Sequence, residues 1–197
     1  MKLLILAYPV LVHVAVVLES APLMAISITI IAVAMLSAPI AARRIWAWPA
    51  LIAAVAAAAG LAWLDATIYL LFIPPVLLNL FLAHLFLGSL REGRTPLISA
   101  VARAIRGNLP DSLARYTRRL TQAWALIFAM MAAWSAVAAV AADHATWSLI
   151  TNVLNYALVA AFLLIEYPWR RWRFRHESHP TIRDYVQGIS RIDFRRL

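Results

Sequence analysis

The sequence predicts an all-α polytopic membrane protein with six transmembrane helices and both termini in the cytoplasm. The 197 residues are 64% hydrophobic and only 14% charged, whereas a soluble domain is about half apolar and about a quarter charged. Hydrophobic runs recur along the chain, and several approach the roughly 20 residues that a spanning helix needs. The basic residues fall in alternate breaks between these runs. Together these features predict a bundle of membrane-spanning helices.

The first run follows Lys2 and ends at Glu19. Because Pro22 would directly follow a cleavage site, we interpret this run as an uncleaved helix and not as a signal peptide. Further breaks occur at Arg43-Arg44, which tryptophans typical of a membrane interface follow, at Asp65 and at Asp143-His144. The predicted spans are residues 3–18, 23–42, 50–64, 66–90, 120–142 and 145–165.

The distribution of charge predicts the orientation. With six spans, all 18 basic residues fall on one side, and the opposite side holds only the acidic residues Glu19, Asp65 and Asp143. Basic loops stay in the cytoplasm. We therefore expect a bacterial inner-membrane protein whose N- and C-termini are cytoplasmic.

The chain is predicted to form one membrane domain, residues 1–165, followed by a basic cytoplasmic tail, residues 166–197. The basic loop 91–119 interrupts the domain on the cytoplasmic side. Within it, Thr95-Pro96 resembles a helix start, apolar residues follow at helical spacing, and Gly107-Asn108 followed by Pro110 resembles a helix end. This pattern predicts a short amphipathic helix near 96–107 at the membrane surface. Asp111 is expected to begin a helix that continues into the fifth span.

The tail repeats this pattern. An aromatic and arginine-rich segment, Tyr167 to Arg173, is expected where the last helix leaves the lipid. Thr181 and Asp184 form a capping box, and apolar residues recur at helical spacing after it. A second amphipathic helix is predicted at 182–192.

Polar side chains inside spans are costly and are functional candidates by default. Such side chains also often do no more than hydrogen-bond a neighbouring helix. Both interpretations stay open for the intramembrane polar residues, which are His13, Asn79, His84, Asn152 and Asn155.

No catalytic motif or phosphate-binding loop is recognisable, and the chain has no cysteine. His84 and Asp111 are the weak candidates for an acid or base, with arginines to hold a phosphate or carboxylate. His176 and His179 lack the spacing of a zinc protease motif, so we expect no metal site and no cofactor. The net charge of +9 is spread along one membrane face, which does not indicate nucleic-acid binding.

The arginines of loop 91–119 have two interpretations. Attraction to anionic lipid is worth about 1 kcal/mol per basic residue near the surface and explains much of the charge. However, the loop holds seven arginines and no lysine, and arginine suits bidentate contacts with phosphate or carboxylate. A specific site for a lipid head group or an acidic acyl carrier protein is therefore the second interpretation. The candidate residues of that site are Arg91, Arg94, Arg103, Arg118, Arg119, Tyr116, Thr117 and Trp124.

Three segments carry a resemblance to a known family: "GRTPLISAVAR", "LPDSLARYTRRLTQAW" and "LNYALVAAFLLIEYPWRRWRF". They resemble a family of small inner-membrane proteins from aryl-polyene and xanthomonadin-type pigment gene clusters. The resemblance covers most of the chain, and the loop motif is its specific part. It implies a non-catalytic accessory role in the biosynthesis or translocation of an envelope lipid or pigment, alongside an acyl carrier protein or other biosynthetic proteins.

More distantly, the chain is similar to the intracellular septation protein A family. The similarity lies in Pro96-Leu97-Ile98 and in Leu120-Thr121-Gln122-Ala123-Trp124. It implies a scaffold for septation or envelope maintenance. A third alternative is a membrane-embedded acyl or glycosyl transferase, which the missing catalytic motif disfavours.

Overall fold

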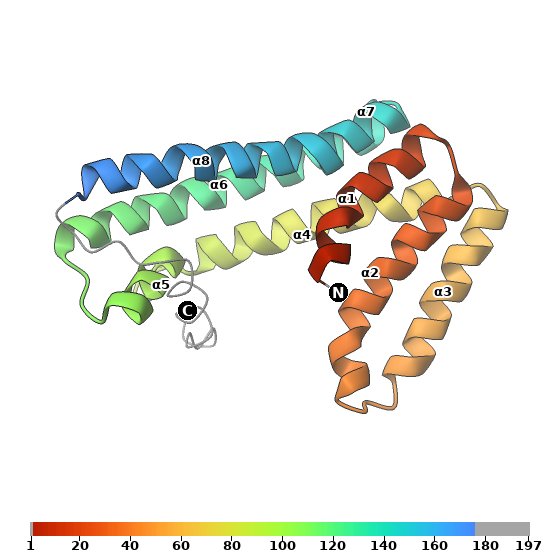
Figure 1. Cartoon of the computed structure of the whole chain (residues 1–197), viewed down its shortest axis with the longest axis horizontal. Helices are drawn as coiled ribbons and strands as arrows, with labels where there is room; N and C mark the ends of the chain where they lie inside the picture. The colour runs from red at the N-terminus through yellow and green to blue at the C-terminus, as the bar shows by residue number, and fades with distance from the viewer. Residues whose placement is uncertain (1, 176–197) are drawn as a thin grey trace. The chain divides into compact units, whose positions relative to one another are not determined.

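The computed structural model describes residues 2–175, with side chains from residue 8 onward. The described residues form eight α-helices and one π-helix and contain no strand, which confirms the all-α prediction. In chain order (Figure 1) the elements are α1 (Lys2–Val17), α2 (Ala21–Ala41), α3 (Ala47–Trp63), α4 (Thr67–Gly88), α5 (Leu97–Arg106), α6 (Asp111–Ala141), α7 (His144–Leu149), the π-helix η1 (Ile150–Leu154) and α8 (Asn155–Arg173).

Four helical stretches of the described chain are long and apolar enough to cross a membrane. They are Ala21–Ala41, Thr67–Gly88, Asp111–Ala141 and the continuous run His144–Arg173, which comprises α7, η1 and α8. The remaining apolar helices, α1 and α3, are shorter, with 16 and 17 residues. The chain is thus a helical protein with the character of a membrane protein.

The chain divides into two compact units, which we call unit 1 and unit 2. Unit 1 comprises Met1–Val76 and Ala133–Val159, and unit 2 comprises Leu77–Ala132 and Ala160–Leu197. The first division falls after Val76, one residue beyond Pro74-Pro75, through which α4 continues as one helix.

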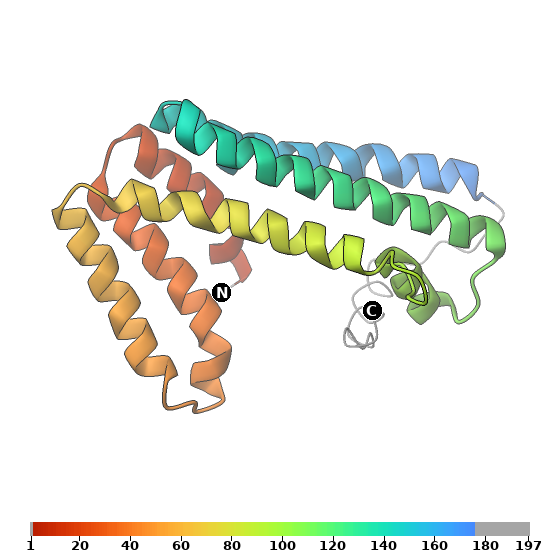
Figure 2. The ribbon, with the colours of Figure 1, turned by 180° about the vertical axis from the view of Figure 1, so that it is seen from behind.

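The core of unit 1 forms where α1 packs against α7 and the first half of α4. Trp147 and Leu71 are almost fully buried there, together with Val12 and Val16 of α1. Phe72 packs on Trp147 with ring centroids 4.6 Å apart. Helices α2 and α3 run antiparallel and side by side as a hairpin (Figures 1 and 2). Burial of these side chains is the main stabilisation of the unit.

The same backbone motif ends α1, α2 and α3. Glu19, Arg43 and Asp65 each have positive φ, at 50°, 54° and 52°. At each turn the next amide N–H bonds a carbonyl five residues back, as in Ser20 to Ala15 (3.0 Å). This is the Schellman arrangement, in which glycine is usual at the left-handed position. A residue with a side chain adopts this left-handed conformation at a cost of about 1–2 kcal/mol.

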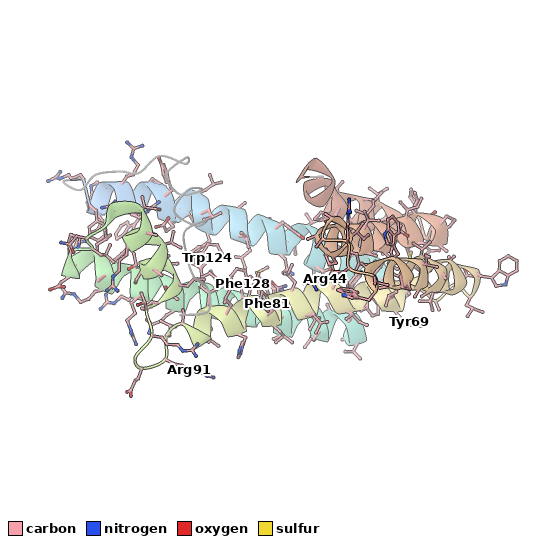
Figure 3. The ribbon with its side chains drawn as sticks, turned by 90° about the horizontal axis from the view of Figure 1, so that it is seen from below. Arg44, Tyr69, Phe81, Arg91, Trp124 and Phe128 are labelled. Atoms are coloured by element: carbon pink, nitrogen blue, oxygen red, sulfur yellow. The ribbon has the colours of Figure 1, made fainter. Side chains whose placement is uncertain are left out.

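Unit 2 has an aromatic core between the described parts of α4, α6 and α8. Trp124 stacks on Phe128 of the same helix at 5.4 Å, and Phe86 of α4 and Phe162 of α8 pack against the pair. Figure 3 shows Trp124 and Phe128 together along α6 and Arg91 apart from them, at the end of α4. This aromatic core holds α4, α6 and α8 together.

Three boundaries differ from the sequence prediction. Helix α5 begins at Leu97, so Pro96 is the N-cap and Thr95 lies outside the helix. Helix α8 continues through Pro168 to Arg173, beyond the predicted end of the last span at residue 165. The sixth span also contains the π-helix η1, which hydrophobic periodicity does not reveal. The predicted helix at 182–192 and the histidines of 176–179 lie outside the described residues.

The other local predictions for the loop are confirmed. Helix α5 ends at Arg106, and its C-cap is Gly107, whose positive φ of 76° glycine adopts at little steric cost. Asp111 begins α6, which runs uninterrupted into the fifth predicted span. Along α5, Leu97 is buried, Val101 and Ile105 are half-buried, and Arg103 is exposed, so the helix is amphipathic as expected.

Candidate anion-binding face and intramembrane polar contacts

Helix α5 is held in unit 2 by contacts at its N-terminus. The amide N–H of Leu97 donates to Ser89 Oγ at 3.0 Å, and that of Ile98 donates to Thr121 Oγ1 at 3.3 Å. Ser89 follows α4 and Thr121 lies on α6, so side chains from outside the helix satisfy the free N–H groups of its first turn. Because these donors are engaged, the N-terminus of α5 is not the place where an anion would bind.

A second buried polar contact fixes the same turn. Ser99 Oγ and Thr117 Oγ1 lie 2.7 Å apart, and Thr117 Oγ1 also lies 3.0 Å from the Leu113 carbonyl, to which it can donate. Both side chains are buried. Thr117 was expected to shape the binding site, and here it packs α5 against α6. The helix is therefore a fixed platform for the arginines around it.

The described part of unit 2 holds eleven arginines against three acidic residues, Glu92, Asp111 and Glu166. Most of these arginines are exposed. We call them the arginine face: Arg91, Arg94, Arg103, Arg106, Arg115, Arg118, Arg119, Arg170, Arg171, Arg173 and Arg175.

Arg118 brings part of this face together. Its guanidinium donates to the Leu90 carbonyl at 3.4 Å, at the turn after α4 that also carries Arg91 and Arg94. Gly93 has a φ of 78° in this turn, and the Arg94 N–H donates to the Arg91 carbonyl at 3.2 Å. Three of the candidate arginines thus belong to one corner of unit 2.

Glu166 contacts side chains of two helices, α6 and α8. Tyr116 of α6 donates to Glu166 Oε1 at 2.9 Å, and Arg170 pairs with the same oxygen at 3.0 Å. Phe174 packs edge-on against Tyr116 with ring centroids 5.1 Å apart. Tyr116 therefore joins α6 to α8, and its hydroxyl is engaged in that contact.

The end of α8 alternates aromatic residues with arginines. Arg171 donates to the Tyr167 hydroxyl at 3.1 Å and lies over its ring, 5.7 Å from the centroid. Trp169 and Trp172 lie 5.3 Å apart, and both are exposed. Exposed tryptophan and tyrosine with arginine are typical of the head-group layer of a membrane.

The remaining candidates are separated. Trp124 is 9% exposed and belongs to the aromatic core. Arg103 and Arg119 are exposed on α5 and α6. His84 and Asp111, the weak catalytic candidates, are exposed on different helices, α4 and α6. Among residues 8–175, no three histidine, aspartate or glutamate side chains form a group that could hold a metal ion.

The polar residues of unit 1 that were predicted to lie within spans form two hydrogen-bonded groups. His13 Nδ1 lies 3.1 Å from Ser148 Oγ, to which Asn152 also donates at 3.2 Å. On another side of the same helical run, Asn155 accepts from the Trp134 indole at 2.6 Å and donates to Ser135 at 3.1 Å. In unit 2, Asn79 is buried.

The hydroxyl partners were not predicted. Ser89, Ser99, Thr121, Ser135 and Ser148 are all buried within the helical assembly. Serine and threonine are common in spanning helices, where they bond their own backbone or a neighbour. For one of them, Ser148, the sequence held an indication. Its four-residue spacing from Asn152 and Tyr156 places three polar side chains along one helix.

Comparison with known proteins gives no match. No protein-family model, no curated protein and no solved structure matches this chain.

Proposed function

We propose that this chain is a six-span inner-membrane protein whose arginine face binds an anionic lipid head group on the cytoplasmic side. The protein would serve as a non-catalytic accessory in the biosynthesis or translocation of an envelope lipid or aryl-polyene-type pigment, as the family resemblance implies. The observation that carries the proposal is the excess of arginines over acidic residues around a helix fixed in place by buried hydroxyls.

The short helices are expected to cross the membrane as well. Helix α3 has 17 residues, about 25 Å at 1.5 Å per residue, slightly less than the roughly 30 Å hydrocarbon core. Exposed tryptophans flank it, with Trp46 and Trp48 at its start and Trp63 at its end. Because α3 runs back along α2, it crosses wherever α2 does. The membrane around a short helix can thin to match it.

Cysteine labelling tests the topology, because the natural chain has no cysteine. Ile45 and Leu64 are 91% and 71% exposed in the turns that flank α3. We expect a membrane-impermeant maleimide applied to spheroplasts to label Leu64→Cys and to spare Ile45→Cys. Labelling of both positions from the same side would mean that α3 does not cross.

Several features favour a lipid head group as the ligand. Exposed aromatic rings accompany the arginines of α8, as they do at the lipid interface. Arginine binds phosphate oxygens in a bidentate manner that lysine cannot reproduce. Glu166 is already paired with Arg170, so this acidic residue does not neutralise the exposed arginines.

Native mass spectrometry of the detergent-solubilised protein with phosphatidylglycerol tests the binding. We expect the triple variant Arg94→Gln, Arg103→Gln and Arg118→Gln to retain at least tenfold less lipid, because losing about 1.4 kcal/mol is a tenfold change. Arg43→Gln with Arg44→Gln, in unit 1, is the control and should retain lipid normally. Equal lipid retention by both variants would mean that the arginine face orients the protein in the membrane but does not bind this lipid specifically. Selective loss of binding to purified acyl carrier protein, with lipid retention unchanged, would make the carrier the ligand instead.

A further inference from the structure

A row of polar side chains lies in unit 1 where α1 packs against α7 and η1. Ser148, Asn152 and Tyr156 recur every four residues along the helical run of α7, η1 and α8, and Tyr8 and His13 lie on α1. We call these five residues the polar seam. His13 pairs with Ser148. None of the five belongs to the arginine face.

The π-helix keeps this row aligned. A residue in a π-helix advances the chain by a smaller rotation than one in an α-helix, because each hydrogen bond spans five residues. In η1 the Asn155 N–H accordingly bonds the Ile150 carbonyl. The four-residue spacing of the polar side chains therefore drifts less around the helix than it would in a regular α-helix. Single π turns of this kind are frequent at functional sites.

The contacts of Ser148 are compatible with a free donor on His13. Ser148 Oγ accepts from Asn152 Nδ2, and its hydroxyl hydrogen can donate to His13 Nδ1. The neutral imidazole then carries its proton on Nε2, because each tautomer has one donor and one acceptor nitrogen. His13 is half-buried, so this N–H donor lies at the edge of the seam.

The two tyrosines add further donors. Tyr8 is half-buried and Tyr156 is 51% exposed. Neither hydroxyl has a hydrogen-bond partner among residues 8–175. Polar groups facing hydrocarbon without a partner are costly. The lipid-facing edge of the seam therefore offers three hydrogen-bond donors and no charge, which suits a neutral acceptor oxygen.

We propose that the polar seam binds a membrane lipid, with His13 Nε2 donating to an ester carbonyl and the phenols of Tyr8 and Tyr156 lying deeper, beside the acyl chains. His13 lies six residues before Glu19, about 9 Å along the helix. The layer between the membrane surface and the hydrocarbon is about 5–8 Å thick. His13 thus lies near the depth at which ester groups join the head group to the acyl chains. The seam is a second lipid site, independent of the arginine face.

Ester-linked and ether-linked phosphatidylcholine of equal chain length form a matched pair of probes, because only the ester lipid has carbonyls and both are zwitterionic. The full-length protein in detergent is given both lipids in equal amounts, and native mass spectrometry measures the ratio retained. We expect the wild-type protein to favour the ester lipid about fivefold, the effect of one hydrogen bond.

Two substitutions remove the donors conservatively. His13→Asn keeps a polar group near the position of Nδ1 for Ser148 but lacks the Nε2 donor. The double variant Tyr8→Phe with Tyr156→Phe removes only two hydroxyls. His13→Asn should lower the ester preference toward parity. The double variant should keep most of it, because these hydroxyls lie about 7.5 Å deeper than His13. Tyr69→Phe is the control, since Tyr69 is 64% exposed on α4 outside the seam, and it should keep the wild-type ratio.

The same lipid measurements distinguish the proposed seam site from the proposed site at the arginine face. The triple variant of Arg94, Arg103 and Arg118 should keep the ester preference even where it loses phosphatidylglycerol. Equal retention of ester and ether lipid by the wild-type protein would overturn the seam as a binding site. So would an ester preference that survives in His13→Asn.

Discussion

The phenol of Tyr116 donates a 2.9 Å hydrogen bond to Glu166, fifty positions further along the chain. Arg170 pairs with the same carboxylate oxygen one helical turn later. Glu166 is thereby held between α6 and α8 at the edge of the arginine face. A sequence search for acids and bases treats Glu166 as one more interfacial charge, whereas the structure gives it two specific partners.

Removal of the Tyr116 hydroxyl should destabilise unit 2. In Tyr116→Phe, Glu166 keeps Arg170 but loses its second partner, so we expect a loss of about 1 kcal/mol in the free energy of unfolding. Thermal unfolding in detergent measures this loss. Tyr167→Phe is the control, because that hydroxyl bonds Arg171 at an exposed position, and its effect should be smaller. An equal effect of the two substitutions would contradict the assigned role of Tyr116.

The hydroxyl contacts at the start of α5 should hold the helix in place. Ser89→Ala with Thr121→Val leaves the amide groups of Leu97 and Ile98 without acceptors. We expect amide hydrogen exchange over residues 97–101 to rise at least tenfold, because losing capping bonds costs about 1–2 kcal/mol. Thr121→Ser alone keeps a hydroxyl and should exchange as the wild type does. Unchanged exchange in the double variant would show that the apolar face of α5 suffices.

Two buried threonines in unit 1 should respond to valine substitution with opposite signs. Thr67 Oγ1 is buried with no hydrogen-bond partner among the described residues, whereas Thr151 Oγ1 donates to the Trp147 carbonyl at 2.9 Å and accepts from Asn152 at 3.1 Å. Removing an unsatisfied hydroxyl is neutral or stabilising, and removing a bonded one costs about 1 kcal/mol. Thermal unfolding should therefore rank Thr67→Val at or above the wild type and Thr151→Val below it. The reverse order would refute the assignment.

Asp143 should make the start of α7 sensitive to acid. Hydrogen bonds from the Thr146 side chain and amide lower the pKa of Asp143 below its ordinary value of 3.8. Because the folded pKa is the lower one, the cap contributes stability above about pH 4 and loses it as the pH falls through the folded value.

Hydrogen exchange at the Thr146 amide reports whether the bond to Asp143 is intact. It is measured from pH 6 down to about pH 3 and corrected for the intrinsic exchange rate. Asp143→Asn is the control, since asparagine caps a helix about as well as aspartate and does not titrate in this range. We expect extra acid-induced opening in the wild type alone. Identical pH profiles would exclude Asp143 as the titrating group.

Much of the local structure could be predicted from residue type and spacing. The amphipathic α5, its end at Gly107 and the start of α6 at Asp111 all follow from rules about the nearest few residues. The sequence also marks the charged turns at Glu19, Arg43 and Asp65. It does not reveal that all three adopt the same left-handed conformation, because glycine is the residue type that indicates this conformation in a sequence.

The candidate site could be predicted only in part. The sequence identifies the arginines because charge in a basic loop is visible without a fold. It offers no way to see that Thr117 bonds Ser99, or that Trp124 packs against Phe86 and Phe162. Such contacts join residues that are 18 or more positions apart or on different helices, and spacing along one helix carries no information about a neighbour.

The sequence by itself determined the helical membrane character of this protein, the sign of its charged turns and the limits of its amphipathic loop helix, because hydrophobic periodicity and helix ends depend on local chemistry. Only the tertiary structure decided which polar side chains find partners. His13 meets Ser148, Tyr116 meets Glu166 and Leu97 meets Ser89 because helix packing brings together groups that no local pattern relates. In an apolar interior each such pairing offsets the cost of burying its polar groups.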